Sequence, residues 1–284
     1  AHWNEHPDRD EKWAEAERSR IGEERFRREH ECEFLIFDET LINSIHLADM
    51  EGVPPVETTG QVRWFKRPTP GHTYLTSLDP SMGTAGDYAA KQVFELPTFE
   101  QIGEWHHNMT PMNQQVRILQ QMNKHIHDTI IEKDSTAPQI FYSMENNTIG
   151  EAALMRVMDI GEENIVGMFL SEPIRKGHRR KFRRGFNTTA KHKIDACTKF
   201  KELVESGKMK INSQLLISEL KDFVASGLSY KAKPGQHDDL VMSCLLMTRM
   251  MKVLADFDPK IFEKWTDRSS ELTTPMPIFG NFYG

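Results

Sequence analysis

The sequence predicts a mixed α/β fold in which helices cover both faces of a central β-sheet. Three segments of strand-like apolar alternation come first, and helical and strand-like segments then follow one another from residue 111 onward. The chain of 284 residues corresponds to one large domain or two small ones. Its composition, 38% apolar and 27% charged, is typical of a soluble globular protein, and no apolar run is long enough to cross a bilayer.

The first three elements predicted in the sheet are strands. Residues 73–78 alternate in polarity and end in Asp79-Pro80, and a glycine-containing turn then leads into a second strand over residues 88–96. A third strand is predicted over residues 99–106. Because the connections are short, the three strands are expected to form an antiparallel meander.

Two helices and two strands follow in alternation. Apolar side chains recur at helical spacing over residues 111–128, and Pro111 stands at the start, where proline is tolerated. Residues 139–144 form a short apolar run, which predicts a buried strand. A helix over residues 148–158 and a strand over residues 165–170 complete this part of the predicted sheet.

The last third of the chain is predicted to be mainly helical. One helix is expected over residues 188–206, ended by a glycine, and another over residues 213–225. A short strand at residues 228–233 precedes a helix over residues 238–257, which is rich in Met and Leu and therefore predicted to be buried on most sides.

The two ends of the chain differ from its middle. Residues 1–33 are dense in charge of both signs with one apolar stripe, which indicates a helix or two, and residues 52–60 are predicted to be a linker. We therefore predict a helical lead-in over residues 1–60, a main domain over residues 61–265 and a C-terminal tail over residues 266–284.

Acidic residues fall at the ends of predicted strands. Asp79 ends the first strand, Glu145 ends the fourth, and Asp238 and Asp239 begin the last helix. Sites in open sheets form outside the carboxyl ends of strands, so these distant carboxylates can converge there. Together they would repel one another, and Mg²⁺ or Mn²⁺ would relieve that repulsion. Two such ions roughly 4 Å apart can support phosphodiester hydrolysis.

Three neighbouring residues are further candidates. Asp87 is within loop reach of Asp79. Asp238 and Asp239 point about 100° apart on a helix, so one is predicted to be a metal ligand and the other to cap the helix or support the ligand. His237 could orient a carboxylate or contact phosphate. Each acid alone is more often a turn former or a helix-start residue, and only their joint occurrence carries the prediction.

Basic residues cluster in a chain that is acidic elsewhere, with 36 Lys and Arg against 42 Asp and Glu. Glycines and phenylalanines interrupt the cluster, which predicts a loop or ribbon that contacts a phosphate backbone without reading sequence; the alternative is a solvated linker. The cluster consists of Arg175, Lys176, Arg179, Arg180, Lys181, Arg183, Arg184, Lys191 and Lys193.

Several motifs are absent from the sequence. It contains no GxxxxGK[ST], GxSxG or HExxH pattern, so it predicts no P-loop of its own. Its three cysteines are far apart and form no CxxC pair, which argues against a disulfide framework or a structural zinc site. The histidines at positions 106, 107, 125 and 127 are predicted to lie on the surface.

The motifs together resemble the large terminase subunit of tailed phages, close to the contractile-tailed, myovirus-type branch. The resemblance covers nearly the whole chain, and its motifs are Leu78-Asp79-Pro80-Ser81, Gly86-Asp87-Tyr88, Glu145-Asn146-Asn147 with Gly150, and the run from Gly235 to Ser243. Residues 26–34 look like the end of that protein's ATPase domain, and residues 185–212 look like its basic stretch and following helix.

This resemblance implies an RNase H-like nuclease domain that cuts concatemeric double-stranded DNA at the start and end of genome packaging. It implies Asp79, Glu145 and Asp239 as metal-binding catalytic acids, with Asp87 near the metals and Asp239 preferred over Asp238. Met82 departs from relatives that carry an acid there. The motor ATPase would be missing, and the full-length motor would meet the portal and the small terminase subunit in the host cytoplasm.

Two alternatives remain open. A resolvase- or transposase-like nuclease with the same acids would prefer branched or end-specific DNA. A DNA-gripping or docking module of the packaging motor would bind duplex DNA without metal, and its nuclease site would be weak or silent without the ATPase.

Overall fold

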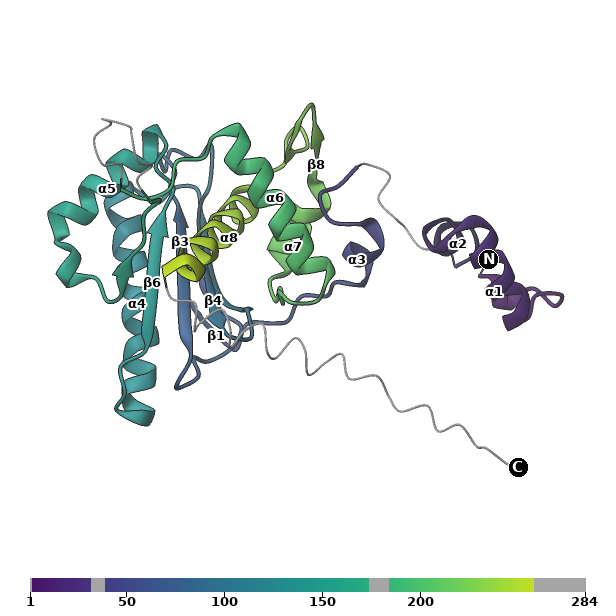
Figure 1. Cartoon of the computed structure of the whole chain (residues 1–284), viewed down its shortest axis with the longest axis horizontal. Coiled ribbons are helices and arrows are strands. Elements are labelled where there is room, and N and C mark those ends of the chain that lie inside the picture. The colour runs from purple at the N-terminus through teal and green to yellow at the C-terminus, as the bar shows by residue number, and fades with distance from the viewer. Residues whose placement is uncertain (1, 32–38, 174–183, 258–284) are drawn as a thin grey trace.

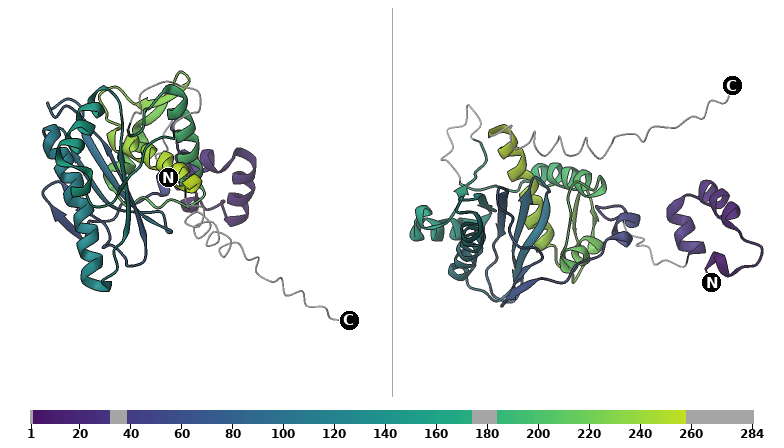
Figure 2. Two further views of the ribbon diagram at one scale, coloured as in Figure 1. Left: turned by 60° about the vertical axis from the view of Figure 1, so that its left-hand side comes forward. Right: turned by 90° about the horizontal axis from the view of Figure 1, so that it is seen from below.

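The computed structural model describes residues 2–31, 39–173 and 184–257 (Figure 1). Within these residues the main body is a β-sheet with helices packed on both of its faces (Figures 1 and 2). The predicted fold class is confirmed.

The described residues place seven strands in the central sheet, in the order β1-β2-β5-β4-β3-β6-β7. Strands β3, β4 and β5 form the predicted antiparallel meander, and β6 lies parallel to β3 on its other side. The bounds are β1 Glu57–Thr59, β2 Val62–Trp64, β3 Thr73–Asp79, β4 Ala89–Leu96, β5 Glu100–His107, β6 Gln139–Met144 and β7 Met168–Phe169.

Each face of the sheet has its own apolar core. Helices α4 (Met112–Asp134) and α5 (Thr148–Ile160) cover the face that includes Tyr74 and Leu78 of β3. Helices α6 (Ala190–Glu205), α7 (Gln214–Asp222) and α8 (Asp239–Phe257) cover the opposite face (Figure 1). Because successive side chains of a strand point to opposite faces, Leu75, Ser77 and Asp79 share the α8 side.

The N-terminal residues form a small helical unit. Helices α1 (Glu11–Ile21) and α2 (Glu23–His30) enclose a cluster of Trp3, Trp13 and Phe26, and a short 3₁₀ helix covers Trp3–Glu5. Helix α3 (Ser44–Asp49) follows, and its Leu47 packs in the same core as α6, α7 and α8. A second 3₁₀ helix covers Glu162–Asn164.

Several predicted element boundaries were wrong. Helix α4 continues six residues further because Ile130 is buried there, and it ends where Ser135 adopts φ 55°. The predicted strand over residues 165–170 contains only the two residues of β7. The helix expected through residue 225 stops at Asp222, and β8 (Phe223–Ser226) then forms a hairpin with β9 (Ser229–Ala232).

The predicted linker also contains structure. Residues 57–59 form β1, which pairs with β2 and so belongs to the central sheet. Both strands are three residues long, too short to show a clear alternation of polarity. In the described part of the chain, no helix has the length and apolar composition needed to cross a bilayer.

Candidate active site

The register of the sheet places Asp79 beside Glu145. Strands β3 and β6 run parallel, and their last paired residues are Leu78 and Met144. The Glu145 amide then donates a hydrogen bond to the Leu78 carbonyl at 3.1 Å. Asp79 and Glu145 therefore leave the carboxyl ends of two adjacent strands at the same level, as predicted from their positions in the sequence.

Helix α8 is fixed to the same end of the sheet by two serines. The hydroxyl of Ser77 lies 2.7 Å from the hydroxyl of Ser243 and donates to the Ser243 carbonyl at 2.9 Å. Ser77 shares its face of β3 with Asp79, and Ser243 follows Asp239 by about one helical turn. This contact sets the start of α8, and with it Asp239, next to the end of β3.

The connection from β6 to α5 holds Glu145. Asn147 caps α5 by accepting a hydrogen bond from the Gly150 amide at 2.7 Å, and its side-chain amide donates to a Glu145 carboxylate oxygen at 2.9 Å. A Cβ atom on Gly150 would lie 1.9 Å from the Glu145 carbonyl oxygen. The Glu-Asn-Asn motif with its glycine is therefore a tight turn that fixes the Glu145 side chain.

The carboxyl groups at this end of the sheet affect one another electrostatically. Burial raises the pKa of Asp79 well above its usual value, and the charges of Glu145, Asp239 and Asp238 raise it further. Burial, followed by the charge of Asp238, raises the pKa of Asp239 to about 6. Three predicted acids thus converge on one region from β3, β6 and α8.

The other predicted residues have distinct positions. A carboxylate oxygen of Asp238 accepts a hydrogen bond from the Ala232 amide at 3.2 Å and lies 3.9 Å from the Lys193 ammonium, so Asp238 is engaged with β9 and α6. Nδ1 of His237 lies 3.7 Å from a carboxylate oxygen of Asp239. Asp87 is exposed, and its charge also raises the pKa of Asp239.

The predicted carboxylates suit a divalent cation, although their side chains are not arranged around a common centre. Among the described residues, no three His, Cys, Asp or Glu side chains are arranged as a metal-binding group. The chemistry of the set still fits, because carboxylate oxygens are the ligands that Mg²⁺ and Mn²⁺ accept, and burial together with neighbouring carboxylates raises the pKa of both Asp79 and Asp239.

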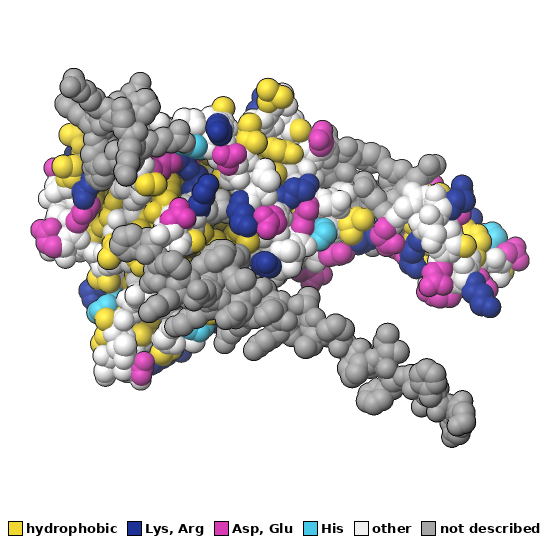
Figure 3. Space-filling model, viewed as in Figure 1, with side chains coloured by type: hydrophobic (Ala, Val, Ile, Leu, Met, Phe, Trp, Pro, Cys, Tyr) yellow, Lys and Arg dark blue, Asp and Glu magenta, His cyan; other side chains and the backbone are white. Residues whose placement is uncertain are grey.

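Most of the predicted basic cluster lies outside the described residues, namely Arg175, Lys176, Arg179, Arg180, Lys181 and Arg183. Of the remainder, Arg184 forms an ion pair with Glu162 at 2.5 Å and lies over the ring of Phe169. Lys191 is exposed, and Lys193 is mostly buried beside Asp238. On the face shown in Figure 3, Lys and Arg side chains are interspersed with acidic ones.

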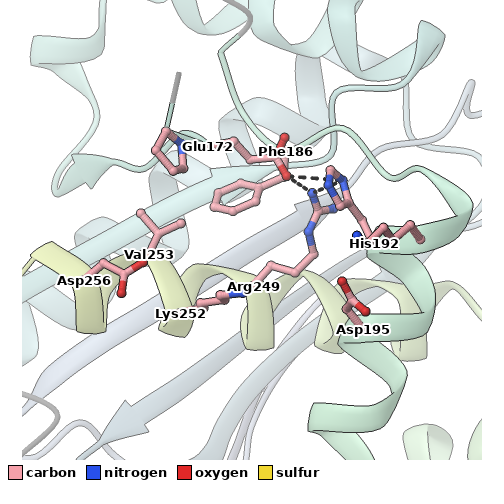
Figure 4. A pocket seen from close by; sticks show the side chains of 10 residues that line it. Glu172, Phe186, His192, Asp195, Arg249, Lys252, Val253 and Asp256 are labelled. Atoms are coloured by element: carbon pink, nitrogen blue, oxygen red, sulfur yellow. Dashed lines mark hydrogen bonds and ion pairs between the residues drawn. The ribbon is translucent and has the colours of Figure 1, made fainter. Parts of the chain in front are cut away.

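Within the basic cluster, Phe186 is anchored beside Glu145. Phe186 pairs with Glu145 in an isolated β-bridge, and the Phe186 carbonyl accepts a hydrogen bond from the Asn146 amide at 2.7 Å. Arg249 of α8 lies under the Phe186 ring and forms an ion pair with Glu172, within a cavity of about 360 Å³ (Figure 4). These contacts hold Phe186 beside Glu145.

Two residues near the acids were not predicted from the sequence. Glu219 of α7 is 9% exposed, and burial raises its pKa to about 9. His106 was predicted to lie on the surface, which was wrong, since its side chain is only 12% exposed and stacks on Tyr88. A sequence signal existed only for Tyr88, which directly follows the Gly86-Asp87 motif.

The sheet order and the acids at the carboxyl ends of β3 and β6 define an RNase H-like domain. A family model described as the terminase RNaseH-like domain matches residues 76–250, and the chain belongs to this family. The resemblance inferred from the motifs is thereby confirmed.

Solved structures share the fold. The large terminase nuclease from thermophilic phage G20c is 20% identical to this chain, with a TM-score of 0.54 over 73% of this chain and 96% of that one. Structures of the same nuclease with bound magnesium and with bound cobalt are each 18% identical, with a TM-score of 0.54 over 74% of this chain and 96% of theirs.

Proposed function

We propose that this chain is the metal-dependent endonuclease domain of a phage packaging terminase, which cuts concatemeric double-stranded DNA during genome packaging. The observation that carries the proposal is the convergence of Asp79, Glu145 and Asp239 at one end of the sheet in a chain of the terminase family. The metal-bound structures of the G20c nuclease add support, because they show that a nuclease of the same fold binds divalent ions.

Asp79, Glu145 and Asp239 would hold two Mg²⁺ or Mn²⁺ ions. The chemistry that a bound pair of such ions supplies is activation of the attacking water and stabilisation of the 3′ oxygen that leaves, which yields 5′-phosphate ends. The contribution of the chain is to fix the three carboxylates. Asn147 orients Glu145, the Ser77–Ser243 contact positions Asp239, and the end of β3 positions Asp79. Asp87 and Asp238 lie close enough to assist, with Asp238 the weaker candidate because Ala232 and Lys193 engage it.

The DNA would be held through its phosphates by the basic segment that starts at Arg175. Phe186 and Arg249 anchor the end of this segment beside Glu145, so a duplex gripped by it would pass near the acids. Such contacts are independent of sequence and weaken steeply with salt.

The division of the chain is also part of the proposal. Residues 1–60 would lead in from an ATPase domain, residues 61–265 would carry the nuclease, and residues 266–284 would be a tail. Leu41, Ile42 and Leu47 of this lead-in pack in the main core. The full-length motor would act in the host cytoplasm with the portal and the small terminase subunit.

Cleavage of supercoiled plasmid in Mg²⁺, Mn²⁺ and EDTA tests the proposal. We expect nicking and linearisation with either metal and none in EDTA. Asp79→Asn and Glu145→Gln should each reduce cleavage by about 1,000-fold or more while leaving DNA binding and folding intact. Asp159→Asn and Glu202→Gln are the matched controls, because they remove exposed carboxylates on α5 and α6.

Each alternative function predicts a different result when DNA binding and cleavage of branched DNA are measured beside plasmid cleavage. Unchanged cleavage in Asp79→Asn would remove the assignment of the site. A wild-type chain that binds duplex DNA in EDTA but cuts nothing with metal would be a gripping module. Preferential cutting of branched DNA would instead indicate a resolvase-like enzyme.

A further inference from the structure

Helix α8 begins with an unusual hydrogen-bonding arrangement at its first turn. The first amide groups of a helix have no partner within the helix. The Asp238 carbonyl accepts the first intrahelical bond, from the Met242 amide at 2.7 Å, so Asp238 occupies the capping position. Its carboxylate would ordinarily accept a bond from the amides that follow. Here that carboxylate accepts from the Ala232 amide instead.

Glu219 supplies the missing acceptor from another helix. Its carboxyl group is buried beneath the start of α8, and Oε2 accepts a hydrogen bond from the Val241 amide at 3.1 Å. The Leu240 amide also stabilises the ionised form of this carboxyl group. A side chain of α7 thus holds the first turn of α8, on which Asp239 is the first residue.

The other carboxyl oxygen of Glu219 begins a second series of contacts that leads to Asp239. Oε1 lies 3.7 Å from Nε2 of His106, a buried nitrogen that forms no hydrogen bond among the described residues. The His106 ring stacks on Tyr88, with centroids 4.1 Å apart and planes at 17°. The Tyr88 backbone amide in turn favours the ionised form of Asp239, and the Tyr88 ring meets His237 edge-on, with centroids 4.8 Å apart.

We propose that Glu219 is a positioning residue of the cleavage site, whose carboxyl group directs the Asp239 carboxylate through the first turn of α8 and through His106 and Tyr88. This inference rests on the proposed function. Glu219 contacts neither the substrate nor a reacting atom; it acts only through Asp239. Because Asp239 is the sole acid of the proposed triad carried by a helix, its direction depends on how that helix begins.

Three variants separate positioning from general stability. Glu219→Leu leaves the Val241 and Leu240 amides without an acceptor, whereas Glu219→Gln retains a carbonyl oxygen for them and an amide for His106. Leu203→Ala opens a cavity near Met251, toward the far end of α8, and serves as the control for lost stability. If Glu219→Leu does not fold, Glu219→Ala leaves the same amides without an acceptor and replaces it.

Two readouts are measured on each chain: Mn²⁺ binding by titration calorimetry and plasmid cleavage under metal saturation. Loss of support behind a metal ligand typically costs 10- to 100-fold, so Glu219→Leu should weaken Mn²⁺ binding about 10-fold and slow cleavage by up to about 100-fold. Glu219→Gln should restore both to within about threefold of wild type, and Leu203→Ala should change neither by more than that.

The outcomes distinguish this inference from the proposed function. If the wild type cuts DNA but Glu219→Leu matches Leu203→Ala in both readouts, the positioning role is wrong and the nuclease stands. If Mn²⁺ binding depends on Glu219 but no DNA is cut, the function is wrong and the positioning role stands. A wild-type chain that neither binds Mn²⁺ nor cuts DNA contradicts both.

Discussion

The acids of this site differ in what surrounds them, although they lie within electrostatic reach of one another. Burial raises the pKa of Asp79, and the carboxylates that are its main charged neighbours raise it further. Asn147 donates a hydrogen bond to Glu145, and the Tyr88 amide favours the ionised form of Asp239. A cation would relieve the repulsion at Asp79 without displacing either of those supports.

Glu219 should make the metal-free protein less stable as the pH rises. Its pKa is about 9 in the folded chain against 4.5 as the ordinary value, chiefly because the carboxyl group is buried. Below about pH 4.5 both states carry the proton, so the stabilising contribution is present in full. As the pH rises toward 9, only the unfolded chain releases the proton, and the free energy of unfolding falls.

Denaturant unfolding in EDTA at pH 6.5, 7.5 and 8.5 measures this effect. Glu219→Gln should show a smaller decline across that range than the wild type. The range avoids His106, whose pKa burial lowers to about 4 and which therefore changes stability in the opposite direction between about pH 4 and 6.5. Parallel declines in the two chains would contradict the burial of an ionisable Glu219.

At the scale of single residues, the sequence predicted the acids of the site but not the residues that position them. Asp79 and Glu145 follow from strand ends and the Asp238-Asp239 pair from a helix start, which are local features, and the resemblance to terminases gave the choice of Asp239. Glu219 occupies an ordinary position of an amphipathic helix, and only the packing of α7 against α8 brings it to Val241, 22 residues further along the chain. The burial of His106 likewise depends on packing, since its ring stacks on Tyr88 and lies beside Glu219.

At the scale of elements, Gly150 controls how α5 meets β6. A Cβ atom at this position would lie 1.9 Å from the Glu145 carbonyl oxygen, which is backbone and cannot move aside cheaply. Gly150→Ala should therefore destabilise the fold by about 1–3 kcal/mol. It should also slow cleavage by about 100-fold, because the displaced turn carries Glu145.

Gly86→Ala is the matched control for this glycine. Gly86 belongs to the motif around Asp87, but an added Cβ atom would meet nothing within 4 Å. We expect this variant to stay within about 0.5 kcal/mol of the wild type and to cut normally. Thermal unfolding and plasmid cleavage of the two variants check the prediction. If Gly150→Ala cuts DNA as fast as Gly86→Ala, then Glu145 tolerates displacement of α5.

Elements with many periodic residues could be predicted, and short ones could not. Strands β3, β4, β5 and β6 and the long helix α8 were placed within two residues of their observed bounds. Residues 223–225 were misassigned because an apolar run of three fits the end of a helix as well as a strand. The hairpin with β9 and the bridge of Val224 to the distant Thr40 decide the structure there.

For the whole molecule, the distribution of charge matters more than the total. The chain carries a formal charge of −6, yet six of its 36 basic residues lie between residues 175 and 183. A duplex would be repelled by the chain on average and attracted at this segment. DNA binding should therefore depend on few residues and be strongly salt-dependent.

Neutralising part of the segment tests this expectation. Each phosphate contact releases about one counterion, so Arg179→Ala, Arg180→Ala and Lys181→Ala together should lower the slope of log K against log salt by about two to three. Fluorescence anisotropy of a labelled duplex in EDTA gives this slope. In the control, alanine replaces Lys124, Lys199 and Lys201, which lie in ion pairs with neighbouring acids on α4 and α6. This control should change the slope by less than about one. Equal slopes in the two variants would contradict a grip by this segment, and cleavage would then have to rely on contacts at the acids alone.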